Sequence, residues 1–191
     1  MPFRRQPTRV LFVCTGNICR SPAAELLFNR AITLIDAPVI ATSAGTRGVV
    51  GHGIHPQVAA ELSALGIAAE DIAAFRARRL NRAMLTAADL VVGMTREHVD
   101  EVLALAPVKL RTTFTLTHLA RLADAGALDA LELPGTQPVD KSVVDDLPGG
   151  IPDPYGGTPE DFHVAVARIA DALARILLAL GLPDSGGRHG V

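Results

Sequence analysis

The sequence has little cysteine and few aromatic residues: its 191 residues include two cysteines, one tyrosine and no tryptophan. Two cysteines are too few for a disulfide scaffold or for a zinc site with four cysteine ligands, so both classes of small protein are excluded. Because Cys14 and Cys19 are the only thiols, we expect a reduced, cytoplasmic location.

The chain also lacks an excess of one charge and a long apolar run. Eighteen basic and twenty acidic side chains give a net charge of -2, so nothing points to a nucleic-acid partner. The apolar run Val10 to Val13 is too short for a signal peptide. The stretch 169–182 is interrupted by Asp171 and Arg175, so no membrane insertion is expected.

What is present is an ordinary globular composition, with 49% hydrophobic and 20% charged residues. This length and balance predict a single domain over residues 1–191, with a core at about 9–182. We expect a short N-terminal extension and a flexible C-terminal tail at 184–191.

Short β-rich runs alternate with helical patterns along the chain. This alternation predicts an α/β fold with a parallel sheet covered by helices on both faces. The segment 124–150 is acidic and rich in proline and glycine, which is typical of a loop. The pattern predicts strands at 9–13, 38–44, 90–94 and 110–114, and helices at 23–35, 55–65, 96–105, 117–125 and 159–180.

The loop after the first strand carries the chemistry. It reads Val13-Cys-Thr-Gly-Asn-Ile-Cys-Arg-Ser-Pro22 and ends in a helix, for which Ser21 is the predicted N-cap. The N-terminus of a helix is an anion site, because its backbone N–H groups are unpaired and its dipole is positive. The backbone N–H groups of Thr15, Gly16, Asn17, Ile18, Cys19 and Arg20 are therefore predicted to surround one phosphate.

The residue types in this loop suit a thiol nucleophile. Cys14 lies beneath the predicted phosphate, where its thiolate can attack the phosphorus. Arg20, six residues later, can bind two phosphate oxygens with parallel hydrogen bonds. Ser21 can donate its hydroxyl to the thiolate, and Asn17 tolerates the left-handed backbone that turns N–H groups inward. The bare Cys-to-Arg spacing is common, and a strand-end cysteine is often simply buried.

A departing alkoxide or phenolate needs a proton, and Asp153 is the candidate general acid. It lies in Ile151-Pro-Asp-Pro-Tyr-Gly156, where Pro152 and Pro154 stiffen the backbone. The alternative is that this Asp-Pro sequence only forms a turn.

These two motifs, with Ser43-Ala-Gly-Thr46 after the second strand, resemble the low-molecular-weight protein tyrosine phosphatases. The resemblance implies a four-stranded parallel sheet flanked by helices, a phosphate loop after the first strand, and no metal or cofactor. By motif position Cys14 resembles the nucleophile, Arg20 the phosphate-binding arginine and Asp153 the general acid. Asn17, Ser21 and Ser43 match positions that hold the loop in shape.

The implied activity is hydrolysis of phosphotyrosine on proteins through a phosphocysteine. The expected partner is a phosphotyrosine protein, for which a bacterial tyrosine kinase is one candidate, and the expected product is inorganic phosphate. A protein arginine phosphatase of the same fold is the alternative, although those relatives carry a threonine where this chain has Ile18. An arsenate reductase needs further cysteines that the chain lacks, and a phosphate-binding module without turnover is a further alternative.

The sequence departs from many relatives around the expected substrate cleft. Arg47-Gly-Val-Val50 stands where an aromatic wall is common, and Gly156 replaces a second tyrosine. Phe75 replaces a frequent histidine, and the segment 124–150 is longer than in short relatives. Tyr155 is therefore the main aromatic side chain left to contact a substrate ring.

Two further groups of residues have more than one interpretation. Cys19 either traps an oxidised Cys14 as a disulfide, as the resemblance suggests, or only packs in the loop. His52 and His55 are close in sequence but have no third ligand nearby, so a surface loop is expected. The remaining helical histidines are expected to be solvated: His98, His118 and His163.

Overall fold

Four parallel strands form the centre of the protein. The computed structural model describes residues 7–34, 38–128 and 150–180. The sheet order is β2-β1-β3-β4, so the chain crosses over between β2 and β3, and β1 is a central strand. This confirms the predicted α/β fold with a parallel sheet. The strands are β1 (Thr8–Cys14), β2 (Val39–Gly45), β3 (Leu90–Gly93) and β4 (Thr113–Thr115).

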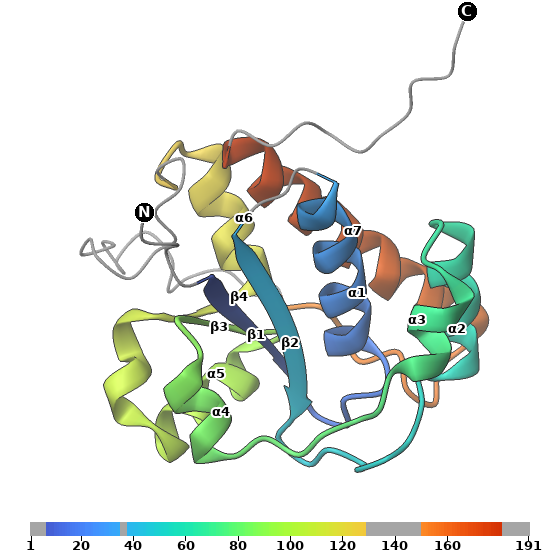
Figure 1. Ribbon diagram of the computed structural model, residues 1–191, viewed down its shortest axis with the longest axis horizontal. Coiled ribbons are helices and arrows are strands. Elements are labelled where there is room, and N and C mark those ends of the chain that lie inside the picture. The colour runs from blue at the N-terminus through green and yellow to red at the C-terminus, as the bar shows by residue number, and fades with distance from the viewer. Residues whose placement is uncertain (1–6, 35–37, 129–149, 181–191) are drawn as a thin grey trace, which may run out of the picture.

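Helices cover both faces of the sheet, as Figure 1 shows. Helices α1, α6 and α7 lie on one face, and α4 and α5 lie on the other. The helices are α1 (Arg20–Thr33), α2 (Pro56–Ala64), α3 (Ala69–Ala74), α4 (Arg82–Ala87), α5 (Arg96–Leu105), α6 (Leu116–Asp124) and α7 (Pro159–Ala179), with a 3-10 turn at Pro107–Arg111.

Alternation of side chains along β1 divides the core in two. Val10 and Phe12 belong to the larger cluster, under α1, α6 and α7. Leu11 and Val13 belong to the smaller cluster, under α4 and α5. All four side chains are buried because successive residues of a strand point to opposite faces. The strand is thus held on both sides, which fixes the position of its carboxyl end.

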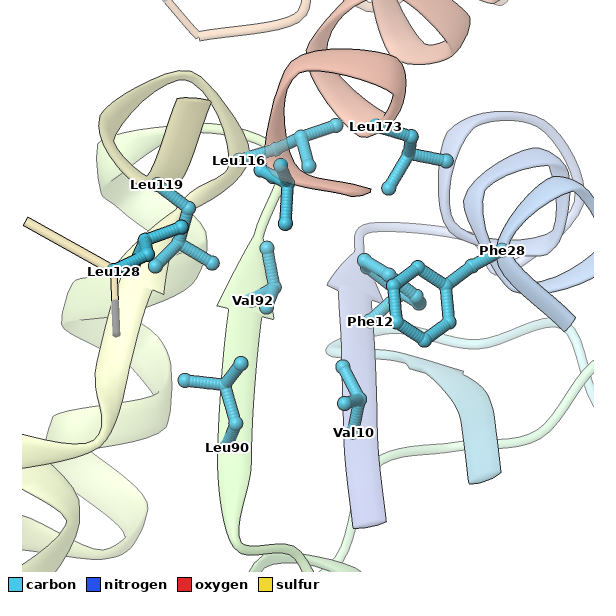
Figure 2. A pocket seen from close by; sticks show the side chains of 10 residues that line it. Val10, Phe12, Phe28, Leu90, Val92, Leu116, Leu119, Leu128 and Leu173 are labelled. Atoms are coloured by element: carbon cyan, nitrogen blue, oxygen red, sulfur yellow. The ribbon is translucent and has the colours of Figure 1, made fainter. Parts of the chain in front are cut away.

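The larger half of the core contains a small apolar cavity of about 20 Å³ (Figure 2). Strand residues Val10 and Val92 face Leu116 and Leu173 from the covering helices across it. A water molecule needs two to four polar partners, and this cavity offers an apolar lining only. We therefore regard it as a packing gap rather than a binding site.

The start of α1 corrects one prediction. The helix begins at Arg20 with Cys19 as its N-cap, so Ser21 lies inside the first turn and is not the cap. The hydroxyl of Ser21 points instead to the sulfur of Cys14. The Ser-Pro pair does mark the start of the helix, but the Ser21 side chain contacts Cys14 and Asn17 of the preceding loop instead of capping the helix.

Other element boundaries also differ from the prediction. Helices α3 and α4 were not predicted; each has only six residues, too short for a visible period. Strand β4 begins at Thr113 rather than residue 110, because the chain from Pro107 to Arg111 forms a 3-10 turn.

Several predictions fall on residues that the structure does not describe. These are most of the N-terminal extension, of which residues 1–6 lie outside the described ranges, the tail at 184–191, and most of the loop 124–150, of which residues 129–149 lie outside them. The single-domain organisation stays a prediction. Within the described ranges, none of the helices has the length and apolar character needed to cross a membrane.

Candidate active site

The loop between β1 and α1 is held from outside by its carbonyl groups. The carbonyl oxygens of Cys14, Thr15, Gly16 and Ile18 accept hydrogen bonds from Thr46, Arg47, Val49 and His55, at 2.8–3.0 Å. Within a planar trans peptide, the N–H of the next residue points the opposite way from the carbonyl. The N–H groups of residues 15, 16, 17 and 19 therefore point inward, away from the 46–55 segment.

The sulfur of Cys14 lies on the inner side of this loop. The backbone N–H of Asn17 donates to Cys14 Sγ at 3.3 Å, as the carbonyl geometry requires. Cys14 is 2% exposed and belongs to the carboxyl end of β1. The loop runs directly into α1, which begins at Arg20, so the N-terminal end of this helix, where the dipole is positive, lies at the end of the loop. This geometry favours both an anion and a thiolate.

Asn17 is the central brace of the loop. Its φ of 57° confirms the predicted left-handed backbone. Its amide Nδ2 donates to Ser21 Oγ at 2.9 Å and to Ser43 Oγ at 2.7 Å. Its Oδ1 accepts from the backbone N–H of Arg78 at 2.7 Å. The buried side chain thus ties the loop to α1, to β2 and to the segment before α4.

Ser21 is placed to stabilise a thiolate. Its Oγ lies 2.9 Å from Cys14 Sγ. Because Oγ accepts a hydrogen bond from Asn17, the Ser21 hydroxyl hydrogen can be donated to the sulfur. This contact agrees with the hydroxyl donation that the sequence predicted.

Glu25 and Arg78 support the loop and were missed by the sequence reasoning. Ser43 donates to Glu25 Oε2 at 2.6 Å, and Arg78 lies 3.7 Å from the same carboxylate oxygen. Burial raises the pKa of Glu25, while Ser43 and Arg78 lower it in part. The available signal was spacing: Glu25 follows Ser21 by four residues and so shares its face of α1.

Gly45 allows β2 to pass close to the loop. A Cβ atom at this position would lie 2.4 Å from the Thr15 carbonyl oxygen and 2.9 Å from the Asn17 nitrogen. Any larger residue would therefore push the loop away from Ser43 and Thr46. This gives a steric reason for the glycine in the Ser-Ala-Gly-Thr stretch.

Arg20 and Asp153 meet across the mouth of the loop, although 133 residues separate them. Arg20 donates to Asp153 Oδ2 at 2.6 Å and to the carbonyl of Ile151 at 3.2 Å. Its guanidinium is buried, whereas the Asp153 side chain is 47% exposed. Arg20 Nε is buried and has no hydrogen-bond acceptor among the described residues.

A cleft of about 270 Å³ opens above Cys14. Its lining includes Arg47, Val49, Asp153 and Tyr155. The Tyr155 side chain is 65% exposed. Its ring contacts the His55 ring edge-on, with 6.0 Å between the ring centroids. His55 in turn stacks on Phe162 at 4.5 Å. The exposed Tyr155 ring therefore packs against His55, which itself packs on the buried Phe162.

Cys19 also lines this cleft and is a buried free thiol. Burial, followed by the nearby Cys14 and Asp153, raises the pKa of Cys19 to about 12, which Arg20 only partly offsets. Of the two thiols, Cys14 is the one that has hydrogen-bond donors around it.

The expectation of a solvated surface was wrong for His98, which is 4% exposed. Its Nε2 lies 3.0 Å from Thr15 Oγ1, and its Nδ1 accepts from the Thr95 N–H at 3.1 Å. The sequence signal for this contact was the spacing of a capping box, in which Thr95 is the N-cap and His98, three residues later, takes the place of the usual glutamate. His163 is exposed and pairs with Glu61. In the described parts of the chain, no three His, Cys, Asp or Glu side chains cluster as a metal site would require.

The parallel sheet, the inward N–H groups and the paired Arg20 and Asp153 form a site at the carboxyl end of β1 that suits an anion such as phosphate. Residues 9–134 match the family model described as low molecular weight phosphotyrosine protein phosphatase. The chain therefore belongs to this family, as the resemblance implied, and it is a phosphatase.

Individual relatives agree with this assignment. The chain is 32% identical to a low molecular weight protein-tyrosine-phosphatase of Streptomyces coelicolor over 90% of this chain and 93% of the relative. It is 30% identical to a protein-arginine-phosphatase of Geobacillus stearothermophilus, over 89% and 94%. A low molecular weight protein tyrosine phosphatase from T. tengcongensis has a similar structure, with a TM-score of 0.70, 27% identity and coverage of 90% and 98%.

Proposed function

We propose that the protein hydrolyses phosphotyrosine on proteins through a phosphocysteine at Cys14. In the first step the Cys14 thiolate attacks the phosphorus and forms the S–P bond. The P–O bond to the tyrosine breaks, and its electron pair leaves on the phenolic oxygen. Asp153 supplies the proton that converts this oxygen to a phenol.

In the second step water attacks the phosphocysteine. Asp153, now a carboxylate, takes a proton from the water, the S–P bond breaks, and inorganic phosphate leaves. The inward N–H groups and Arg20 bind the three non-bridging oxygens during both steps. These donors act where negative charge develops, which is the most effective form of transition-state stabilisation.

The observation that carries the proposal is the donor Arg20 Nε, which is buried and has no hydrogen-bond partner among the described residues. A buried polar group without a partner costs free energy, and native structures rarely keep one without a functional reason. Arg20 begins α1, directly after the loop that carries the inward N–H groups and follows Cys14. A tetrahedral phosphate oxygen is the ligand that would satisfy it.

The direct test is Cys14→Ser with an aryl phosphate as substrate. A serine hydroxyl is a far weaker nucleophile than a thiolate at neutral pH, so turnover should fall below detection. Circular dichroism and binding of inorganic phosphate verify that the fold and the loop remain. Residual turnover near the wild-type rate would overturn the proposed role of Cys14.

Phosphoarginine is the second candidate substrate, because a relative with 30% identity is an arginine phosphatase. Ile18 and Tyr155 both line the cleft. Its aliphatic side chain suits an aromatic ring better than a charged guanidinium, which favours tyrosine. Peptides carrying phosphotyrosine or phosphoarginine should be compared on the wild type and on Ile18→Thr. A wild-type preference for phosphoarginine would reverse the assignment.

We further infer that a bacterial tyrosine kinase is a candidate partner and that the protein works in the cytoplasm. The location is supported by the two free thiols, which a reducing compartment preserves. Incubation of a phosphorylated kinase with Cys14→Ser, followed by co-purification, tests the partner. The same experiment with the dephosphorylated kinase is the control.

Cys19 provides a prediction about oxidation. Peroxide oxidises Cys14 to a sulfenic acid. The Cys19 sulfur gives up its proton and attacks the Cys14 sulfur, the S–O bond breaks and water leaves. The resulting Cys14–Cys19 disulfide is reversed by a thiol reductant. After peroxide treatment the wild type should recover most of its activity in dithiothreitol. Cys19→Ser, normalised to its own reduced activity, should recover only a small fraction. Equal recovery in both proteins would leave Cys19 with a packing role.

A further inference from the structure

A buried histidine outside the proposed catalytic set contacts the phosphate loop. His98 belongs to the first turn of α5, which follows β3, and its ring lies between two threonines. Nδ1 is 3.1 Å from the Thr95 nitrogen and 2.8 Å from Thr95 Oγ1. Nε2 is 3.0 Å from Thr15 Oγ1. Thr15 directly follows Cys14, so this contact joins α5 to the loop.

The partners of His98 determine which nitrogen carries the proton. The backbone N–H of Thr95 can only donate, so Nδ1 has to accept and carries no hydrogen. A neutral ring then has its hydrogen on Nε2 and donates it to Thr15. Burial, followed by the charge of Arg20, lowers the pKa of His98 to about 4, which agrees with a neutral ring.

Two donors then occupy the Thr15 hydroxyl oxygen. His98 Nε2 donates at 3.0 Å, and Arg20, which has no acceptor atoms, donates more weakly at 3.4 Å. A hydroxyl oxygen accepts two hydrogen bonds and donates one, so the Thr15 hydrogen is left for a third direction. Thr15 lines the cleft above Cys14. A phosphoryl group bound in this cleft is an acceptor that this hydrogen could reach.

The junction that holds His98 also holds the loop of the proposed general acid. The backbone N–H of Ile151 donates to the Met94 carbonyl at 2.8 Å. Gly150 lies so close to this junction that a Cβ atom there would be 2.7 Å from the Met94 oxygen. The end of β3 therefore positions one residue of the phosphate loop and the start of the Asp153 loop together.

We propose that His98 is a positioning residue that donates from Nε2 to Thr15 and so presents the Thr15 hydroxyl hydrogen to the bound phosphoryl group. The proposal rests on the proposed phosphatase chemistry for its kinetic effect. The protonation state of the ring and the affinity for inorganic phosphate do not depend on turnover. These two measurements separate a failure of this inference from a failure of the proposed function.

Two substitutions separate the two nitrogens of His98. His98→Asn keeps an acceptor near the place of Nδ1 and removes the donor to Thr15. His98→Gln keeps a donor near the place of Nε2 and removes the acceptor for Thr95. Loss of one hydrogen bond to the phosphoryl group is worth about tenfold. We expect His98→Asn and Thr15→Val each to weaken inorganic phosphate binding and to lower kcat/KM by about this factor.

The conservative variants and the double variant distinguish positioning from structural support. His98→Gln and Thr15→Ser should recover most of the loss. His98→Asn should add little in a Thr15→Val background, because both changes remove the same hydrogen bond. Additive losses, or a loss in His98→Gln as large as in His98→Asn, would overturn the proposal.

The ring itself can be observed by nitrogen NMR on the wild type at neutral pH. The proposal requires a protonated Nε2 and an unprotonated Nδ1. A doubly protonated ring, or a hydrogen on Nδ1, would contradict it whatever the kinetics show.

Discussion

The floor of the cleft, formed by Asn17, Ser21 and Ser43, and its rim, formed by Arg47, Val49 and Tyr155, differ in burial and in hydrogen bonding. On the floor, Asn17, Ser21 and Ser43 are fully buried and are joined by hydrogen bonds of 2.7–2.9 Å. On the rim, Val49 is 38% and Tyr155 65% exposed, and the Arg47 side chain, which is 76% exposed, lies 3.8 Å from Glu101. A substitution on the floor removes hydrogen bonds between buried polar atoms. A substitution on the rim leaves those hydrogen bonds in place.

This difference separates the chemistry from the choice of substrate. The floor recognises the phosphoryl group, which is the same in every phosphate monoester. The rim contacts whatever the phosphate is attached to. Substitutions on the floor should therefore reduce activity toward all substrates and also reduce stability. Substitutions on the rim should alter preference and leave stability within about 0.5 kcal/mol, as is usual for surface sites.

Asp153 belongs to both regions, because its exposed carboxylate is bound to the buried Arg20. Asp153→Asn removes the proton donor and should lower kcat by roughly 10²–10⁴. The loss in kcat should be larger for phenyl phosphate than for p-nitrophenyl phosphate. The p-nitrophenolate anion is a more stable leaving group and depends less on protonation by an acid. Steady-state kinetics on both substrates measure it. An equal loss on the two substrates would mean that Asp153 is not the acid.

Asn17 tests the floor without removing a reacting group. Asn17→Gly keeps the left-handed backbone but removes one hydrogen bond from each of Ser21, Ser43 and the Arg78 N–H. We expect a loss of about 1–3 kcal/mol in the free energy of unfolding and a large fall in kcat/KM on every substrate.

The matched control for this prediction is Asn29→Ala. Asn29 makes two hydrogen bonds to the backbone of Ala41, far along β2 from the loop. This change should cost stability while leaving kcat/KM nearly unchanged. If both variants lose activity in proportion to stability, the floor has no special part in catalysis.

Tyr155 tests the rim and should give the smallest effect. Tyr155→Ala removes the ring that His55 supports, and a ring contact is worth roughly 0.5–1.5 kcal/mol. KM for an aryl phosphate should rise roughly three- to tenfold, while inhibition by inorganic phosphate stays the same. Tyr155→Phe should behave like the wild type. Equal losses for the aryl phosphate and for inorganic phosphate would place Tyr155 with the floor.

The sequence predicted the parts of the site that depend on local pattern. An apolar strand followed by Gly-Asn and a helix start predicted the loop, and the left-handed Asn17 is confirmed at φ 57°. The contact between Cys14 and Ser21 follows from the same segment. The conformation of the loop and the start of the helix depend on residues close to each other in sequence, so they could be predicted without knowing which distant segments pack nearby.

The sequence could not predict what distant segments bring to the loop. His98 reaches Thr15 across 83 positions, and Arg20 reaches Asp153 across 133. Such contacts depend on strand order, which the pattern of elements leaves open. The burial of His98 also follows from tertiary packing, which overrides the usual exposure of a helical histidine.

The most direct test of the account is the covalent intermediate on Cys14. The wild type is mixed with an aryl phosphate, quenched in acid during turnover, digested and analysed by mass spectrometry. The account predicts one phosphoryl group on the peptide that contains Cys14, and none on that peptide in Cys14→Ser. Full turnover with the phosphoryl group on another residue, or with no phosphorylated peptide, would contradict it.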